Sequence, residues 1–219
     1  MVYKYDGIDI NITRQGSGEP VFLLHGWGCT GDIFKHIGSV LSTAYTTYSF
    51  DFPGFGASDE PTTVWGVEEY TRSIEALAQT EGMENPILIG HSFGGRVSIV
   101  YASRNKVQKV MLVDAAGVKP KRSLTYYRKV YTFKLIKKLL PLVVGKARAE
   151  KIIEQRRAKA GSSDYSQATP MMRAILSKVV NEDLCHLMPK IAAPTLLFWG
   201  RERYGNAISR CEEDGKIDS

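Results

Sequence analysis

Short apolar runs alternate with amphipathic stretches through the first 118 residues. Apolar and polar positions alternate over residues 3–12 around Asp6-Gly7, which predicts a β-hairpin. The run Val21-Phe22-Leu23-Leu24 is apolar throughout, as in strands that are buried on both faces of a parallel sheet. Further strands are predicted at 45–51, 86–89 and 107–113, with helical stretches between them. This alternation of strands and helices indicates an α/β protein with a doubly wound, mostly parallel sheet.

The alternation stops at about residue 119. From 119 to 188 the sequence has helical patterns and no strand, and a strand pattern returns at 194–200. A helical insertion between two strands of such a sheet is predicted to form a lid. The expected organisation is therefore a core over 1–118, a helical lid over 119–188, a resumed core strand over 189–203 and an atypical polar tail over 204–219.

The segment Gly90-His91-Ser92-Phe93-Gly94 joins the strand at 86–89 to a helical stretch. A serine at a sharp strand-to-helix turn is the arrangement of a nucleophile elbow, in which the serine backbone is strained and its neighbours must be small. Gly90 and Gly94 are expected to supply the conformational freedom of the turn. The turn would lift the Ser92 hydroxyl above the sheet, and the N–H groups that begin the helix would point at negative charge developing there.

Four motifs together resemble the α/β-hydrolase fold family, in its lid-bearing branch of small esterases and carbon–carbon bond hydrolases. They are Leu24-His25-Gly26-Trp27-Gly28, Asp51-Phe52-Pro53-Gly54-Phe55-Gly56-Ala57-Ser58, Gly90-His91-Ser92-Phe93-Gly94-Gly95 and Pro194-Thr195-Leu196-Leu197-Phe198-Trp199-Gly200. The resemblance implies that Ser92 is the nucleophile and that the backbone N–H groups of Trp27 and Phe93 form the oxyanion hole. An acyl-transfer intermediate needs such a pair of preorganised donors.

The sequence departs from the family at the other two members of the catalytic triad. The family order is serine, acid, histidine, yet no aspartate follows the strand at 194–200 and no histidine follows His186. Asp114, at the end of an earlier strand, is either an alternative acid or a cap of the loop to the lid. We expect an altered C-terminus that lacks the last strand and helix, because the tail from Tyr204 on is polar and without pattern. With plausible codons, a reading frame shifted by one base from Arg203 spells Asp-Thr-Ala-Met-Pro, which resembles what the family carries there. Without a general base, Ser92 would be a weak nucleophile.

None of the four histidines is expected to be the missing base. His25 is predicted to brace the oxyanion loop, and His91 to form pocket wall or packing, because neighbouring positions around a turn point in different directions. His36 is expected on a helix surface, and His186 lies at the end of the lid. The loop from Asp51 to Asp59 is expected to be a structural glycine turn near the pocket.

Positive charge is concentrated in one part of the chain. The 219 residues carry a net charge of +6, but residues 119–160 contain fourteen Lys or Arg and two acids, so this segment carries +12 and the remainder −6. The basic character is local and does not indicate nucleic-acid binding. The favoured interpretation is a solvated helical lid whose apolar face covers the pocket. The alternatives are selection of acidic substrates and docking on an anionic membrane through Lys134, Lys137 and Lys138.

Compartment and cofactors follow from what the sequence lacks. Residues 1–6 do not have the apolar core of a signal peptide, and no apolar run is long enough to span a bilayer, so a soluble, cytoplasmic protein is expected. Cys29, Cys185 and Cys211 form no Cys-x-x-Cys pair, so neither a disulfide framework nor a zinc site is expected, which fits a reducing compartment. No metal or organic cofactor is implied.

The expected function is that of a serine hydrolase that cleaves a small carboxylic ester through an acyl-enzyme on Ser92. The enzymatic alternative is hydrolysis of a carbon–carbon bond in a diketone-type acid, for which the family uses the same motifs. The alternative from another class is a ligand-binding relative without catalysis, which the absent triad histidine favours. The expected partner is a small-molecule ester or related acyl substrate, and the sequence specifies no oligomeric state.

Overall fold

The computed structural model describes residues 1–119, 124–146, 148–153 and 168–200. The chain divides into two compact units. The first contains residues 1–119 and the chain from Pro170 onward, and the second lies within residues 120–169. The predicted polar tail at 204–219, and the last residues of the predicted strand segment before it, lie outside the described residues.

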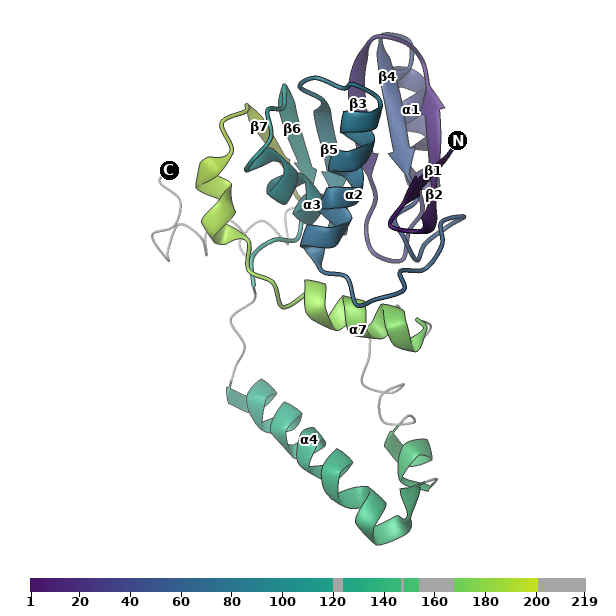
Figure 1. Cartoon of the computed structure of the whole chain (residues 1–219). Helices are drawn as coiled ribbons and strands as arrows, with labels where there is room; N and C mark the ends of the chain where they lie inside the picture. The colour runs from purple at the N-terminus through teal and green to yellow at the C-terminus, as the bar shows by residue number, and fades with distance from the viewer. Residues whose placement is uncertain (120–123, 147, 154–167, 201–219) are drawn as a thin grey trace. The chain divides into compact units, whose positions relative to one another are not determined.

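The first unit is built on one sheet, whose seven described strands have the order β1-β2-β4-β3-β5-β6-β7 (Figure 1). The strands are β1 (Val2–Tyr5), β2 (Ile8–Gln15), β3 (Glu19–Leu24), β4 (Tyr45–Phe50), β5 (Ile87–His91), β6 (Lys109–Val113) and β7 (Thr195–Phe198). β2 pairs antiparallel with β1 and with β4, and all other neighbours are parallel. The predicted doubly wound, mostly parallel sheet is confirmed. So is the predicted hairpin, which turns at Asp6 and Gly7 with φ of 51° and 78°.

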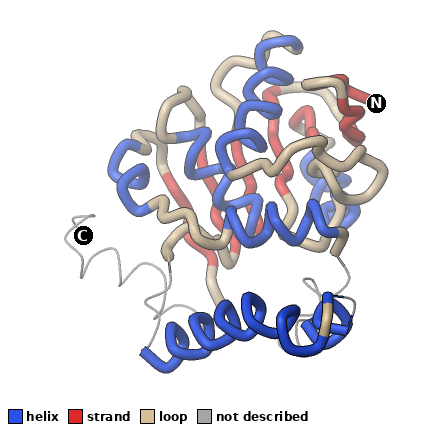
Figure 2. Tube along the Cα trace, turned by 60° about the horizontal axis from the view of Figure 1, so that its bottom comes forward, coloured by secondary structure: helices blue, strands red, loops and turns tan. Residues whose placement is uncertain are grey.

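Helices connect the parallel strands, as the alternating pattern predicts. In the first unit they are η1 (Gly31–Phe34), α1 (Lys35–Leu41), α2 (Val67–Thr80), α3 (Phe93–Ala102), α7 (Pro170–Val179) and η2 (Cys185–Lys190). The second unit contains α4 (Leu124–Val144). Figure 2 shows the helices of the first unit on both sides of its strands.

Alternate residues of β3 show which helices cover each face of the sheet. Val21 and Leu23 are buried in a cluster with Phe34, on the side of η1 and α1. Phe22 points the other way, and its ring centroid lies 6.1 Å from that of Tyr101 in α3. Because neighbouring side chains of a strand point to opposite faces, α1 and α3 cover opposite faces of the sheet. The apolar run of β3 is therefore buried on both sides.

The sequence placed 119–188 in one helical insertion, whereas the structure joins α7 and η2 to the first unit. The reason is burial. Met172, Ile175 and Val179 recur at helical spacing along α7 and are all buried. The N–H of Leu184 also donates a 2.9 Å hydrogen bond to the carbonyl of Gly117, which ties the segment after α7 to the loop after β6.

Strand β7 is the last in the sheet order and is exposed along its length. Leu196 is 55% exposed and Phe198 is 66% exposed, although both belong to the apolar run that predicts a core strand. Within the described residues, β6 is the only strand that pairs with β7. One edge of β7 is therefore open in the described part of the sheet, and its side chains lack the cover that buries β3 and β5.

Candidate active site

Ser92 occupies a strained backbone conformation between β5 and α3. Its φ is 48° and its ψ is −103°, a region that residues other than glycine enter at a cost of about 1–3 kcal/mol. Main-chain hydrogen bonds hold this conformation. The N–H of Ser92 donates to the carbonyl of Val113 at 3.0 Å, and the carbonyl of Ser92 accepts from the N–H groups of Gly95 at 3.1 Å and Ala116 at 3.0 Å. The strand, strained serine and helix expected of the elbow are all present.

The glycines on either side of Ser92 are needed for space. A Cβ atom on Gly94 would overlap the main-chain carbonyl of Leu24, and one on Gly90 would overlap Ser98 Oγ and lie 2.6 Å from the carbonyl oxygen of Gly94. Neither glycine has a positive φ; within the turn that conformation belongs to Ser92 itself. The expectation that these glycines supply conformational freedom is corrected accordingly, since they allow α3 to approach β3 and β5 closely.

The loop that follows β3 packs directly on this turn. The N–H of Gly94 donates a 3.0 Å hydrogen bond to the carbonyl of His25. A Cβ on Gly26 would lie 3.3 Å from Ser92 Cβ, so Gly26 passes beside the serine side chain. The rings of Trp27 and Phe93 meet edge to face with centroids 5.5 Å apart. The structure thus brings together Ser92, Trp27 and Phe93, the three residues singled out from the sequence.

The main-chain N–H groups of Trp27 and Phe93 are free to bind an acceptor. Neither donates a hydrogen bond to any residue in the described part of the chain. Phe93 is the first residue of α3, so its N–H belongs to the helix terminus that has no partner within the helix. Such N–H groups are suited to stabilise negative charge.

His25 is fully buried and braces the loop that carries Trp27. Its Nδ1–H donates to the carbonyl of Gly26 at 2.7 Å, and its Nε2 accepts from the N–H of Phe52 at 2.9 Å. Burial lowers the pKa of His25 to about 4, so the ring is neutral at pH 7. Because both ring nitrogens are engaged, His25 cannot take a proton from Ser92 without breaking this bracing.

Asp51 organises the loop between β4 and α2. Its carboxylate accepts hydrogen bonds from the N–H groups of Gly31 and Ala57 and from Asn11 Nδ2, at 2.7, 3.0 and 2.9 Å. Burial acts to raise the pKa of Asp51, but these hydrogen bonds outweigh it and hold the pKa below its ordinary value. The loop therefore has the structural role expected of it. The sequence did not show that Asp51 is its centre, because the three donors lie on separate segments.

No histidine is hydrogen-bonded to the Ser92 hydroxyl in the described residues, which include all four. Ser92 Oγ makes no hydrogen bond there, and His36 and His186 are exposed. The ring of His91 packs against Gly26, with its buried Nδ1 unpaired within the described part of the chain. These positions agree with the roles expected from the sequence.

Asp114 holds the end of β7. Its N–H donates to the carbonyl of Phe198 at 2.8 Å, and its Oδ1 accepts from the N–H of Gly200 at 3.1 Å. Its φ is 42°, a strained value for a residue other than glycine. The sequence left open a cap of the loop to the lid and an alternative acid, and the described contacts of Asp114 are instead with the end of β7.

A buried arginine one helical turn after Ser92 was not identified from the sequence. Arg96 is 4% exposed, and its Nη1 donates to the main-chain carbonyl of Glu182 at 2.9 Å. The Glu182 carboxylate accepts from the N–H of Val67 at the start of α2, at 3.1 Å. Burial lowers the pKa of Arg96 and raises that of Glu182. A charged residue within the apolar stretch of α3 was the available signal, but nothing local indicated a partner 86 residues away.

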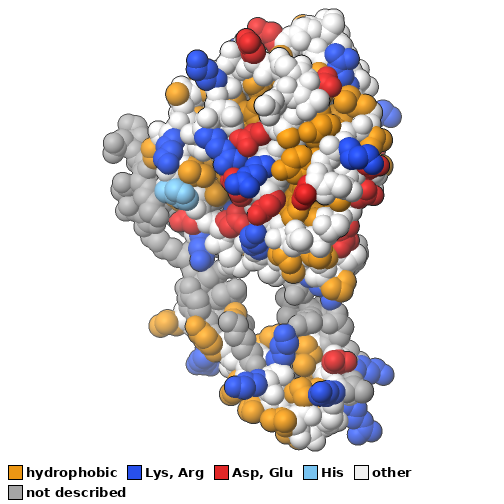
Figure 3. All heavy atoms as spheres, in the orientation of Figure 1, with side chains coloured by type: hydrophobic (Ala, Val, Ile, Leu, Met, Phe, Trp, Pro, Cys, Tyr) orange, Lys and Arg blue, Asp and Glu red, His pale blue; other side chains and the backbone are white. Residues whose placement is uncertain are grey.

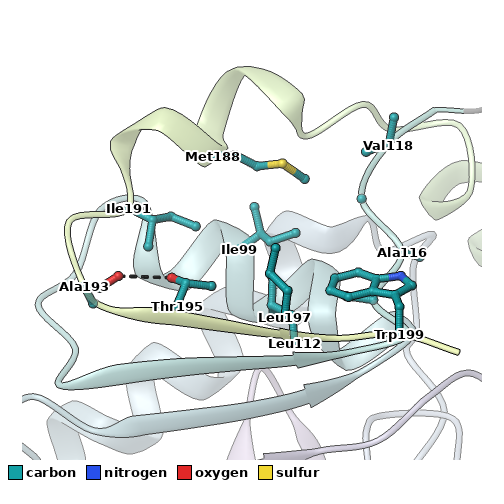
Figure 4. Close-up of a pocket in the computed structure, with 12 residues that line it drawn as sticks. Ile99, Leu112, Ala116, Val118, Met188, Ile191, Ala193, Thr195, Leu197 and Trp199 are labelled. Carbon is teal, nitrogen blue, oxygen red and sulfur yellow. Dashed lines mark hydrogen bonds between the residues drawn. The ribbon is translucent and has the colours of Figure 1, made fainter. Parts of the chain in front are cut away.

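An apolar cavity of about 320 Å³ lies on the α3 face of the sheet (Figure 4). Its walls come from α3, β6, η2 and β7, with Met188 opposite Leu112 and Leu197, and Trp199 at one end. Ser92, Trp27 and Phe93 are not among its lining residues. Two of its lining residues border the elbow: Ala116 donates its N–H to the carbonyl of Ser92, and Ala115 packs against Gly95.

Metal ligands do not gather in the described part of the chain. Within those ranges, no group of three or more His, Cys, Asp or Glu side chains is placed to hold a metal ion.

The chain is similar in sequence and fold to known proteins. The family profile described as alpha/beta hydrolase fold matches residues 19–203, most of the chain. The chain belongs to the alpha/beta hydrolase family. Among curated relatives, the 2-(acetamidomethylene)succinate hydrolase of Mesorhizobium japonicum is 32% identical over 109 residues, which is 49% of this chain and 39% of the relative. The 2-hydroxy-6-oxo-2,4-heptadienoate hydrolase of Pseudomonas putida is 30% identical over 118 residues, 51% of this chain and 43% of the relative.

Solved structures extend the similarity over more of this alpha/beta hydrolase. The esterase from Exiguobacterium antarcticum superimposes with a TM-score of 0.62 and 26% identity, over 88% of this chain and 77% of that one. The two curated relatives are matched over less than half of their own length.

Proposed function

We propose that this alpha/beta hydrolase cleaves a small carboxylic ester through an acyl-enzyme on Ser92. Ser92 Oγ attacks the ester carbonyl, the N–H groups of Trp27 and Phe93 bind the oxyanion, the alcohol leaves, and water then releases the acid. The observation that carries the proposal is the strained serine at the start of α3 beside two N–H groups that have no hydrogen-bond partner among the described residues. The similarity to an esterase supports the ester as the substrate class.

A serine nucleophile also separates this site from others in the same family. Haloalkane and epoxide opening in this fold use an aspartate at the elbow, where this chain has Ser92. Hydrolysis of a carbon–carbon bond in a diketone-type acid is the enzymatic alternative, and the relative named as a 2-hydroxy-6-oxo-2,4-heptadienoate hydrolase favours it. Turnover of a p-nitrophenyl ester and of a vinylogous diketone acid, measured on the same preparation, distinguishes the two reactions.

A second candidate function rests on the Ser92 hydroxyl itself. It has no hydrogen-bonded histidine in the described residues, and a serine without a base is a poor nucleophile. A protein of this kind would bind an ester or acid beside Trp27 and Phe93 without turning it over.

Covalent labelling with a fluorophosphonate tests both candidates. The proposal expects a label on Ser92 that is absent from Ser92→Ala and retained in Ser103→Ala, a serine at the other end of α3 whose hydroxyl donates to the carbonyl of Val100. Label on a residue other than Ser92 would contradict the esterase proposal. A chain that takes no label but is still thermally stabilised by an ester analogue would replace that proposal with the binding function.

A further inference from the structure

Helix α4 of the second unit carries an exposed apolar stripe. Its members are Leu124, Tyr131, Leu135, Leu139 and Leu142, which we call the α4 stripe, and their side chains are between 46% and 89% exposed. Their spacing of seven, four, four and three residues places them on one face of the helix. Single exposed leucines are ordinary, whereas several exposed apolar side chains on one helix face are typical of an interaction surface.

The other side of α4 is already in contact with protein. Val130, Ile136, Leu140 and Val144 are half-buried. Ala149 and Ile153, which follow α4 in the same unit, are buried. Apart from Val143, which is 80% exposed, the exposed apolar side chains described on α4 belong to the stripe.

Positive side chains border the stripe. Arg128 and Lys138 are exposed and lie, by helical spacing, on either side of its centre line. Lys137, Lys146 and Arg148 are exposed on the same unit, and residues 119–160 carry a net charge of +12. Figure 3 shows apolar and basic side chains next to one another over this part of the surface. This charge favours an anionic surface as the partner.

We infer that the α4 stripe lies in the interface of an anionic lipid membrane, with the helix parallel to the surface. In that orientation the leucines enter the boundary of the acyl chains, while Arg128 and Lys138 extend their charged ends to the headgroups. The described helices do not offer another mode of attachment, since none of them has both the length and the apolar character required to cross a bilayer. Attachment by α4 is peripheral and reversible.

Binding of the full-length chain to vesicles of phosphatidylcholine, with or without phosphatidylserine, tests the inference. The chain should sediment with the vesicles that contain phosphatidylserine and remain in solution with the others, and added salt should release it. Arg128→Gln with Lys138→Gln should weaken binding roughly 30-fold, because each cation near an anionic surface contributes about fivefold in affinity. Leu135→Ser should weaken it about tenfold through lost apolar burial.

Matched controls come from the first unit. Val40→Ser and Lys35→Gln change an exposed apolar residue and an exposed cation of α1, and both should leave vesicle binding unchanged. Far-UV circular dichroism of each variant checks that α4 is retained, and the salt dependence of the unaltered chain tests the inference without any variant.

Three results would overturn the inference. The first is equal binding to both kinds of vesicle, or none. The second is a Leu135→Ser chain that binds vesicles normally but has an altered KM for a soluble p-nitrophenyl ester, which would assign the stripe to substrate cover. The third is a dimer that Leu135→Ser dissociates while vesicle binding persists, which would assign the stripe to a second copy of the chain.

Discussion

Replacing Gly94 with alanine should destabilise the fold by about 3 kcal/mol. The new Cβ would overlap the carbonyl of Leu24 and lie 2.8 Å from Leu24 Cβ, where an ordinary contact begins at 3.4 Å. Helix α3 and strand β3 must then separate, which stretches the 3.0 Å hydrogen bond from Gly94 N–H to the carbonyl of His25. Overpacking of this kind costs roughly 1–3 kcal/mol, the lost hydrogen bond costs about 1 kcal/mol, and the higher helix propensity of alanine returns less than about 1 kcal/mol.

Gly38→Ala is the matched control, because it makes the same chemical change in the middle of α1. A Cβ there would meet Leu23 Cδ1 at 3.4 Å and Gln15 Oε1 at 3.9 Å, which are ordinary contacts. Only the propensity gain remains, and we expect stabilisation of up to about 1 kcal/mol. For a domain of this size the two variants should shift the Tm by roughly 6–12 °C downward and 2–4 °C upward.

Thermal and urea unfolding, followed by far-UV circular dichroism, measure both shifts. Equal stability of Gly94→Ala and the unaltered chain would refute the close approach of α3 to β3. An equal loss in both variants would refute the claim that local space decides the sign.

Three further predictions concern the elbow and its support. His25→Asn should remove a dependence of stability on acid pH. In the unaltered chain the unfolded histidine takes up a proton below its ordinary pKa of 6.5, whereas the buried ring does so only near pH 4. The free energy of unfolding of the unaltered chain, measured by urea unfolding, should therefore fall by up to about 3 kcal/mol between pH 7 and pH 4. A variant with the same slope would place that titration elsewhere. Asp51→Asn should cost about 3 kcal/mol at pH 7, because an amide cannot accept all three hydrogen bonds, and a loss below 1 kcal/mol would contradict this role. Ser92→Gly should be more stable to unfolding than Ser92→Ala by about 1 kcal/mol, and should have the higher Tm, because glycine tolerates a φ of 48°. Equal stabilities of the two variants would mean that the turn is unstrained.

The fold could be predicted because its strands are marked by local pattern. The apolar run at β3 is buried on both faces, and the hairpin is marked by Asp6-Gly7, so each signal lies within a few residues. The C-terminal end of the helical insertion could not be predicted from the sequence as accurately as the strands. Its end depends on which helix buries its apolar face in the first unit, and the spacing of Met172, Ile175 and Val179 shows an apolar face without showing what covers it.

The same distinction applies to the candidate site. Ser92, Trp27 and Phe93 could be identified from the sequence because each lies in a short local motif. The structure brings the three residues together. The roles of Arg96 and Asp51 could not be predicted from the sequence, because their hydrogen-bond partners come from distant segments. The glycines of the elbow show a subtler limit: the sequence indicates that small residues are required, but only the structure shows that space, and not backbone freedom, is the reason.

The way in which the site is built determines which assay can decide its function. Two preorganised N–H donors stabilise an oxyanion whether or not a base activates the serine, and each donor is worth about 3 kcal/mol in known hydrolases. A triad enzyme that loses one member retains roughly 10³–10⁴-fold catalysis over water through such donors and through binding. Slow ester turnover would therefore persist even with an inactive Ser92, and turnover alone cannot distinguish the esterase from the ligand-binding protein. Covalent capture of Ser92 can, because a stable bond to its Oγ forms only when that atom acts as the nucleophile.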